Sequence, residues 1–288
     1  MDLHLLSDDE RRAQCRRELE GLEHWLRRLI HETLSAAHGA EYLDGVDQGG
    51  RRVIKKPVAR DITDRRAREP QRYHRPVDAA HLDDLVTVLC NPENWRQYFG
   101  EALSGAFPLG SEEARTFLGR LIDIRHKLSH ANPISVHEAA RVVCYTLDVI
   151  GALKGYYMKR NLENEYNVPR ILRVADSLGN VYHVPELGGE GVTSIRTTPS
   201  LRPGDRLSIE VEIDPSFERS SYTIEWRWLR MTSEEGGDSE RLVIDIDNRH
   251  VDETFKVQCY VNSTKEWHRH GVFDDLVQIT YRVLPPLS

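Results

Sequence analysis

The stretch RHKLSH at residues 125–130 holds the residue types best suited to chemistry in this chain. A guanidinium binds a phosphate group through a planar fork of N–H donors. An imidazole accepts and returns a proton near neutral pH. Arg125 and His130 therefore provide a minimal set of groups for cutting RNA without a metal ion. His126 adds a second imidazole directly beside the arginine.

The spacing of Arg125 and His130 limits how the two side chains can act together. On a straight α-helix, residues five positions apart point about 140° away from each other. The two converge on one target only if the helix loosens near His130. Pro133 makes such loosening reasonable, because a proline disfavours helical backbone at the residue before it. His126 lies about 100° from Arg125, near the polar face of His130.

Two amphipathic helices should position this motif. The helix that carries it is expected to begin at Ser111, because the carboxylates of the next two residues suit the positive end of a helix dipole. It should end between His130 and Asn132. The following helix should begin with a capping box, in which Ser135 and Glu138 satisfy each other's backbone N–H groups. The motif would then lie at the junction of two helices.

The rest of the first half also has helical patterns. Apolar residues spaced by three and four predict a helix over residues 8–38 that stops at Gly39. Helical spacing returns at residue 77, breaks at Asn91-Pro92 and resumes over residues 95–103. We therefore expect an all-α domain over residues 1–165.

The second half changes to the period-two pattern of β-strands. Alternation of polar and apolar residues predicts about seven short strands separated by turn residues. Five strong segments cover residues 206–213, 222–228, 241–246, 255–261 and 276–283, and two weaker ones lie at 171–174 and 181–184. This spacing is typical of an antiparallel, immunoglobulin-like β-sandwich, expected over residues 170–288. Trp226 and Trp228 share one strand face and are expected in its core.

The net charge of −7 is unevenly distributed. Residues 1–170 hold 26 basic and 26 acidic residues, whereas residues 171–288 hold 13 and 20. An acidic β domain would repel RNA, so it suits a protein partner better.

Residues 51–75 form a basic block with ten basic and three acidic residues. The block contains Pro57 and Pro70 and no helical stripe, so we expect a long connector with a short hairpin around Val53-Ile54. Such a block is most often a solvated loop, but it could also attract an RNA backbone. The expected RNA contacts are Arg51, Arg52, Lys55 and Lys56, together with Lys127 inside the motif.

Several other classes of protein have no support in the sequence. No apolar run is long enough to span a bilayer, and the first residues lack the pattern of a secretion signal. The four cysteines are widely spaced, which argues against a disulfide framework or a zinc site and favours the cytoplasm. His268-Arg269-His270 near Asp274 lacks further ligands at fixed spacing, so no metal or other cofactor is expected. No phosphate-binding glycine loop or serine-hydrolase elbow is present.

Over about residues 8–160, the Arg125-to-His130 spacing near the end of a helix, within an all-α domain, resembles the signature of the HEPN superfamily. The aromatic segment 94–99 and the long helix after the motif fit the RNA-processing and defence branch. The resemblance implies a metal-independent endoribonuclease in which two signatures meet across a dimer axis. Arg125 would then bind the scissile phosphate and His130 would be the general base or acid. His126 occupies a position where the family often has Asn or Asp.

Three functions remain open at this point. The first is a dimeric ribonuclease, a toxin or antiphage defence effector whose β domain targets or regulates it. The second is a non-catalytic interaction protein, in which the helical domain forms a homodimer and the β domain recruits a protein partner. The third is RNA binding without cleavage, through residues 51–75.

Overall fold

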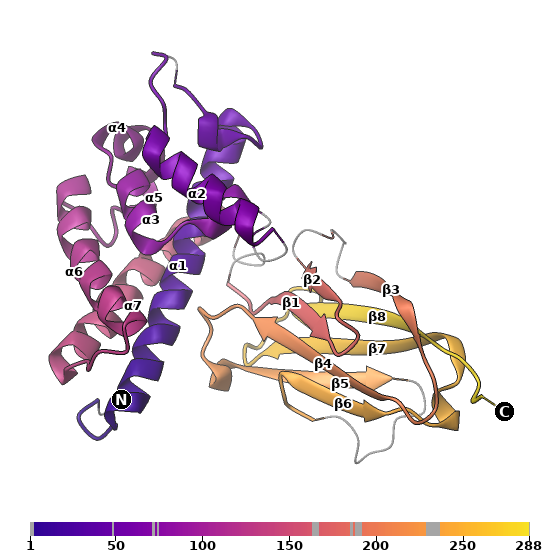
Figure 1. Cartoon of the computed structure of the whole chain (residues 1–288). Helices are drawn as coiled ribbons and strands as arrows, with labels where there is room; N and C mark the ends of the chain where they lie inside the picture. The colour runs from indigo at the N-terminus through magenta and orange to yellow at the C-terminus, as the bar shows by residue number, and fades with distance from the viewer. Residues whose placement is uncertain are drawn as a thin grey trace. The chain divides into compact units, whose positions relative to one another are not determined.

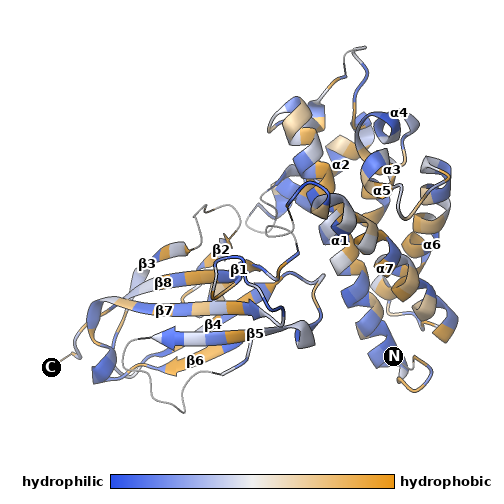
Figure 2. Cartoon of the chain, turned by 180° about the vertical axis from the view of Figure 1, so that it is seen from behind, coloured by the Kyte–Doolittle hydropathy of each residue, from blue (hydrophilic) through white to orange (hydrophobic). Residues whose placement is uncertain are grey.

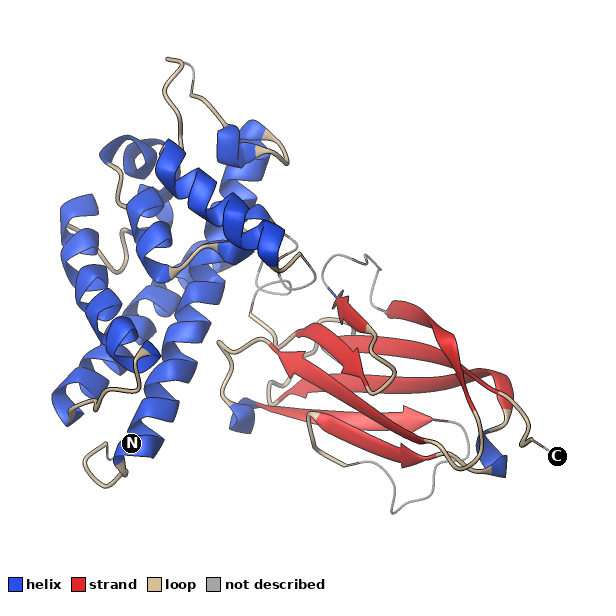
Figure 3. Ribbon diagram, in the orientation of Figure 1, coloured by secondary structure: helices blue, strands red, loops and turns tan. Residues whose placement is uncertain are grey.

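The computed structural model describes residues 3–47, 49–70, 73, 75–162, 167–184, 187, 192–228 and 237–287. The chain divides into two compact units, Met1–Asn161 and Leu162–Ser288. The first unit is helical and the second consists of two mostly antiparallel sheets, so α and β structure are separated along the chain (Figures 1 and 3). The expected end of the helical domain at residue 165 lies outside the described residues.

Among its described residues, the helical unit contains four long helices and several short helical segments. The elements are α1 (Asp8–His38), η1 (Tyr42–Asp44), α2 (Lys56–Arg68), η2 (Pro76–Ala79), α3 (Leu82–Leu89), α4 (Pro92–Asn94), η3 (Trp95–Phe99), α5 (Gly100–Leu103), α6 (Ser111–Ser129) and α7 (Val136–Met158). No helix in the described residues is long and apolar enough to cross a membrane.

Helix α1 forms the centre of this unit. Ser7 and Glu10 form a capping box at its start, and Gly39 ends it with a φ of 78°, which favours glycine. The expected helix over residues 8–38 is thus confirmed. The side chain of Trp25 is fully buried, and its ring lies 5.8 Å from that of Tyr157 on α7. The remaining helices pack around this apolar face, as the helical spacing predicts.

The prediction of a connector without helix over residues 51–75 was wrong. Helix α2 occupies Lys56–Arg68, with Pro57 in its first turn, where the missing N–H of proline does no harm. The helix buries just Ala59 and Ile62 among the described residues, so its apolar stripe is too sparse to see in the sequence. The predicted hairpin at Val53-Ile54 was also misplaced. The antiparallel bridge joins Val46 to Arg52, before that pair.

Helices α6 and α7 agree with the sequence at the junction between them. Helix α6 begins at Ser111, although Gly110 rather than Ser111 is its N-cap residue, with a φ of 98°. Helix α7 begins after Ser135 with the expected capping box to Glu138. Both helices bury residues three and four positions apart, so their packing fixes where the RHKLSH motif at residues 125–130 lies.

The described part of the second unit forms two four-stranded sheets. The strands are β1 (Ile171–Asp176), β2 (Val181–His183), β3 (Thr193–Leu201), β4 (Arg206–Ile213), β5 (Tyr222–Trp228), β6 (Arg241–Asp245), β7 (Asp252–Ser263) and β8 (Asp275–Val283), with short 3-10 turns η5 (Arg219–Ser221) and η6 (Asn248–His250). One sheet has the order β2-β1-β4-β6 and the other the order β3-β8-β7-β5.

The two sheets share one apolar core, to which both contribute buried residues. Alternate side chains of each strand enter it, and β5 buries Tyr222, Ile224, Trp226 and Trp228 in strict alternation. The expected core position of the two tryptophans is confirmed. The indole N–H of Trp226 donates to the carbonyl of Ser239 at 2.8 Å, so this buried donor is satisfied.

The sequence missed strand β3, and the prediction of a purely antiparallel arrangement was incomplete. Thr193–Leu201 pairs in parallel with β8, at the edge of its sheet. The strand contains Pro199 and five hydroxyl side chains, so its sequence resembles a loop, although Thr193, Ile195, Thr197 and Leu201 are buried. Proline is tolerated at sheet edges because it cannot donate to the ladder.

Candidate functional site at the end of helix α6

The RHKLSH motif ends in a tight helical stop. Ala131 has a φ of 54°, Asn132 N donates to Lys127 O at 3.0 Å, and Ala131 N donates to Leu128 O at 3.2 Å. These two bonds are the Schellman pattern of a helix C-terminus, with His130 as the C-cap residue. The backbone N–H of His130 still reaches the carbonyl of His126 at 3.2 Å. The helix therefore stays regular up to His130.

This regular backbone keeps Arg125 and His130 apart within one chain. The two positions point about 140° away from each other on a regular helix. No hydrogen bond or ion pair joins their side chains in the part of the chain that the structure describes. The expected loosening, which would turn both side chains toward one target, does not occur before His130.

Arg125 points into the helical unit, where it contacts α1 and the start of α3. Its Nη2 donates to Nδ1 of His81 at 3.2 Å, and its Nε lies 3.6 Å from a carboxylate oxygen of Glu23. The Arg125 side chain is 28% exposed, so part of it reaches solvent. The arginine is thus held in place by its contacts with His81 and Glu23 and stays partly exposed.

His81 is a site residue that the sequence did not reveal. A guanidinium has no acceptor atom, so Nδ1 of His81 must accept and the neutral ring carries its proton on Nε2. Partial burial lowers the pKa of His81, and the guanidiniums of Arg65 and Arg125 lower it further. His81 lies 44 positions before Arg125, and no local motif connects the two. The contact comes from the packing of α3 against α6.

Ion pairs surround the Arg125–His81 contact. Glu23 binds Nη2 of Arg27 at 2.5 Å, and Arg27 also donates to the carbonyl of Ala80 at 2.8 Å. Asp84 accepts from the backbone N–H of His81 at 3.0 Å and from Nη2 of Arg65 at 2.5 Å. The cluster thus contains the guanidiniums of Arg27, Arg65 and Arg125 against the carboxylates of Glu23 and Asp84.

His126 and His130 lie on the outside of the helix. Both residues are exposed, and neither imidazole has a hydrogen-bond partner among the described residues. Arg12 of α1 contacts the residue after His130, since its Nη1 donates to the carbonyl of Ala131 at 2.7 Å. The first half of α1 is strongly hydrophilic (Figure 2). Arg12 also pairs with Asp8 and Asp9, so its charge is partly balanced.

The predicted RNA contacts differ in how available they are. Arg51 is bound to Asp47 at 2.9 Å and donates to two asparagine side chains, and Arg52 is bound to Asp44 at 2.5 Å. These two arginines fasten the loop before α2. Lys55 and Lys56 are exposed. Lys127 is engaged in a 2.5 Å ion pair with Glu138, which fastens α6 to the start of α7.

No group of three or more histidine, cysteine, aspartate or glutamate side chains in the described ranges is arranged to hold a metal ion. His268 instead contacts the buried carboxylate of Asp274 at 3.1 Å. That carboxylate also accepts two backbone N–H bonds and so organises the loop between β7 and β8.

Comparisons with known proteins give little guidance. No protein-family model matches the chain, and no curated protein matches it. Among solved structures, the chain is weakly similar to a nucleoside hydrolase-related hypothetical protein from Saccharophagus degradans that is associated with carbohydrate metabolism. That match has a TM-score of 0.27 and 10% identity, and it covers 53% of this chain and 33% of the other. A similarity at this level supports no conclusion about fold or function.

Proposed function

We propose that the helical unit is a metal-independent endoribonuclease of the HEPN type that acts as a homodimer. The observation that carries the proposal is the state of the three motif side chains. Arg125 is held in place yet partly exposed, and the imidazoles of His126 and His130 are exposed without a hydrogen-bond partner in the described residues. These are the groups that a phosphodiester substrate would need.

The proposed reaction is attack of a ribose 2′-hydroxyl on the neighbouring phosphate. Arg125 would bind the phosphate and stabilise the charge that develops on it. His130 would take the proton from the 2′-hydroxyl while the new bond from O2′ to phosphorus forms. The bond from phosphorus to the 5′-oxygen then breaks, and a second imidazole protonates the leaving oxygen. The products would be a cyclic phosphate and a free 5′-hydroxyl.

The divergence of Arg125 and His130 is the reason for proposing a dimer. A single helix end points the two side chains about 140° apart, so one chain does not aim both at one phosphate. A second copy, related by a two-fold axis, would bring the histidine of one protomer toward the arginine of the other. Each chain would then contribute half of the site.

A second candidate function is supported by the contacts of Arg125. Its pairing with Glu23 and His81 is what a structural arginine would also show. In this alternative, the helical unit dimerises without catalysis and the β unit recruits a protein partner.

For the β unit we propose an immunoglobulin-like domain that binds a partner protein. The support is the face-to-face pair of sheets, with β3 running parallel to β8 at one edge. Its acidic charge favours a protein over RNA as the partner. The whole chain would then be a cytoplasmic toxin or antiphage effector, with one unit to cut RNA and one to target it.

The deciding experiment is RNA cleavage by the purified chain in the presence of EDTA. We expect His130→Ala to lower the rate by about 10²- to 10⁴-fold, the usual contribution of a general acid or base. His137→Ala is a matched control, because His137 is an exposed histidine outside the motif. Equal activity of wild type and His130→Ala would leave the non-catalytic function as the better proposal.

Mixing two inactive variants tests whether the site spans two chains. We expect Arg125→Ala and His130→Ala proteins, inactive separately, to regain part of the activity when they are refolded or co-expressed together. A mixed dimer restores one wild-type arginine and one wild-type histidine across the interface. If the mixture stays inactive although mixed dimers form, a composite site is ruled out.

A further inference from the structure

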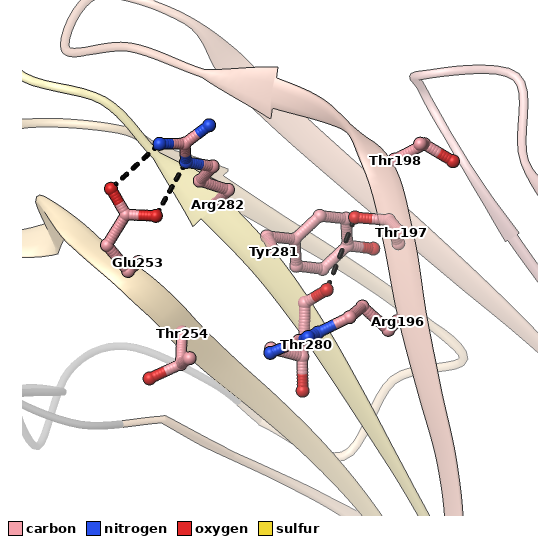
Figure 4. Close-up of a pocket in the computed structure, with 8 residues that line it drawn as sticks. All are labelled: Arg196, Thr197, Thr198, Glu253, Thr254, Thr280, Tyr281 and Arg282. Atoms are coloured by element: carbon pink, nitrogen blue, oxygen red, sulfur yellow. Dashed lines mark hydrogen bonds and ion pairs between the residues drawn. The ribbon is translucent and has the colours of Figure 1, made fainter.

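The β unit has a groove on its surface where β3, β8 and the start of β7 lie side by side (Figure 4). Its volume is about 340 Å³, and its lining includes two arginines and four threonines. The RHKLSH motif at residues 125–130 plays no part in this groove, so its function can be considered separately from RNA cleavage.

The groove lies where the two strands that flank β8 are both irregular. The pairing of β3 with β8 shifts between Arg196 and Ser200, which leaves three β3 residues opposite Tyr281. The pairing of β7 with β8 shifts between Asp252 and Phe255. Both strands therefore bulge away from β8 beside residues 281–282. Bulges of this kind often occur where a sheet presents side chains for function.

Arg196 differs from most arginines of this unit. Its side chain is exposed and forms no hydrogen bond or ion pair with the described residues. By contrast, Arg282 on the other side of the groove binds Glu253 through two contacts of 2.6 and 2.9 Å (Figure 4). Other arginines of the unit also form ion pairs with an aspartate or glutamate: Arg206, Arg219, Arg227 and Arg249.

A hydroxyl group lies next to this uncompensated cation. Thr280 is the cross-strand partner of Arg196, and the Arg196 side chain runs over it (Figure 4). The Thr280 hydroxyl has no hydrogen-bond partner among the described residues. Thr254 lies across the groove, where its hydroxyl lies 3.2 Å from a carboxylate oxygen of Asp252. The groove thus offers one planar set of cationic donors with neutral donors beside it.

We propose that this groove binds a carboxylate group, with Arg196 as its bidentate partner and the hydroxyl of Thr280 as a further donor. A guanidinium and a carboxylate match in shape and charge. The Arg196 guanidinium, with which no carboxylate of the described residues pairs, attracts a negative charge. A phosphate dianion fits less well, because the carboxylate of Glu253 forms part of the wall. Within an acidic unit, the groove is a local site for an acidic side chain or a small carboxylate.

The test is a titration of the labelled full-length protein, followed by NMR of the Arg196 side-chain N–H and the Thr280 amide. The probes are N-acetylglutamate methylamide, its neutral glutamine counterpart, acetate and inorganic phosphate. We expect saturable shifts with the glutamate probe in the millimolar range and none with the glutamine probe. If acetate binds as tightly as the glutamate probe, a free carboxylate is sufficient for binding. If the glutamate probe binds more tightly than acetate, the groove prefers a carboxylate carried by a peptide.

Variants assign the binding to the groove. Arg196→Gln should weaken binding of the glutamate probe at least about tenfold, because a charge-assisted bidentate contact is lost. Thr280→Val keeps the shape of the side chain and should weaken binding of the same probe about two- to fivefold. Arg241→Gln is the matched control, since Arg241 is an exposed arginine that contacts Ser208 outside the groove. The proposal fails if Arg196→Gln binds like wild type, if the glutamine probe binds equally, or if phosphate binds more tightly than the glutamate probe.

Discussion

Replacing Glu138 with glutamine should destabilise the junction between α6 and α7, where His130 lies. Glu138 accepts from Lys127 at 2.5 Å and from the backbone N–H of Ser135 at 2.9 Å. The Lys127 ammonium and then the Ser135 N–H hold the pKa of Glu138 at about 2, against an ordinary value of 4.5. The charged carboxylate is therefore stabilised by folding.

The pKa difference sets a ceiling on this contribution. At about 1.4 kcal/mol for each pKa unit, the ceiling is roughly 3 kcal/mol. The Lys127 side chain is 47% exposed, so water and salt weaken the ion pair considerably. We therefore expect Glu138→Gln to lower the free energy of unfolding by about 1.5 kcal/mol at pH 7, with the lost capping-box charge included.

The dependence on pH gives a second test with a fixed sign. Because the folded pKa lies below the unfolded one, the contribution is complete above about pH 5 and is lost as the pH falls toward 2. The gap between wild type and Glu138→Gln should therefore narrow by more than half between pH 7 and pH 3. Urea unfolding followed by far-ultraviolet circular dichroism measures both values.

A matched control removes the effect of net charge. Glu112→Gln makes the same charge change in the first turn of α6. The Glu112 side chain is 77% exposed, and its ion-pair partner, Arg115, is 3.9 Å away. We expect it to change stability by less than about 0.5 kcal/mol. A Glu138→Gln protein as stable as Glu112→Gln at pH 7, or a gap that does not change with pH, would refute the reasoning.

Three further predictions concern packing, backbone strain and thiol exposure. Gly100→Ala should destabilise the chain by about 1 kcal/mol or more in the same urea assay, because the new methyl group would lie 2.9 Å from the carbonyl oxygen of Trp95. Gly119→Ala should instead stabilise α6 by about 0.5–1 kcal/mol, because its methyl group would enter open space. Ala131→Gly should stabilise the end of α6 by about 1 kcal/mol in thermal unfolding, since its φ of 54° suits glycine, and a loss of stability would contradict the assigned backbone. Of the four cysteines Cys144 alone is exposed, so a thiol reagent should modify one cysteine per native chain rapidly, and two or more fast-reacting thiols would show that the core opens readily.

The extent of sequence prediction differs between elements. Helix α1, the capping box at Ser135 and most strands were predictable, because each repeats one pattern over many residues or carries a local cap. Helix α2 and strand β3 were missed for a common reason. Each buries few apolar side chains on one side, and each contains a proline that mimics a loop signal at a position where proline is tolerated.

The sequence by itself determined the motif and the chemistry of its side chains. It placed Arg125 and His130 at the end of a helix, because the residue types and the Pro133 stop are local features. It could not show that Arg125 contacts His81, since the two residues are 44 positions apart and meet through the packing of separate helices. Tertiary structure also decided which basic side chains are available, because Asp47 and Asp44 approach Arg51 and Arg52 once the loop before α2 is folded.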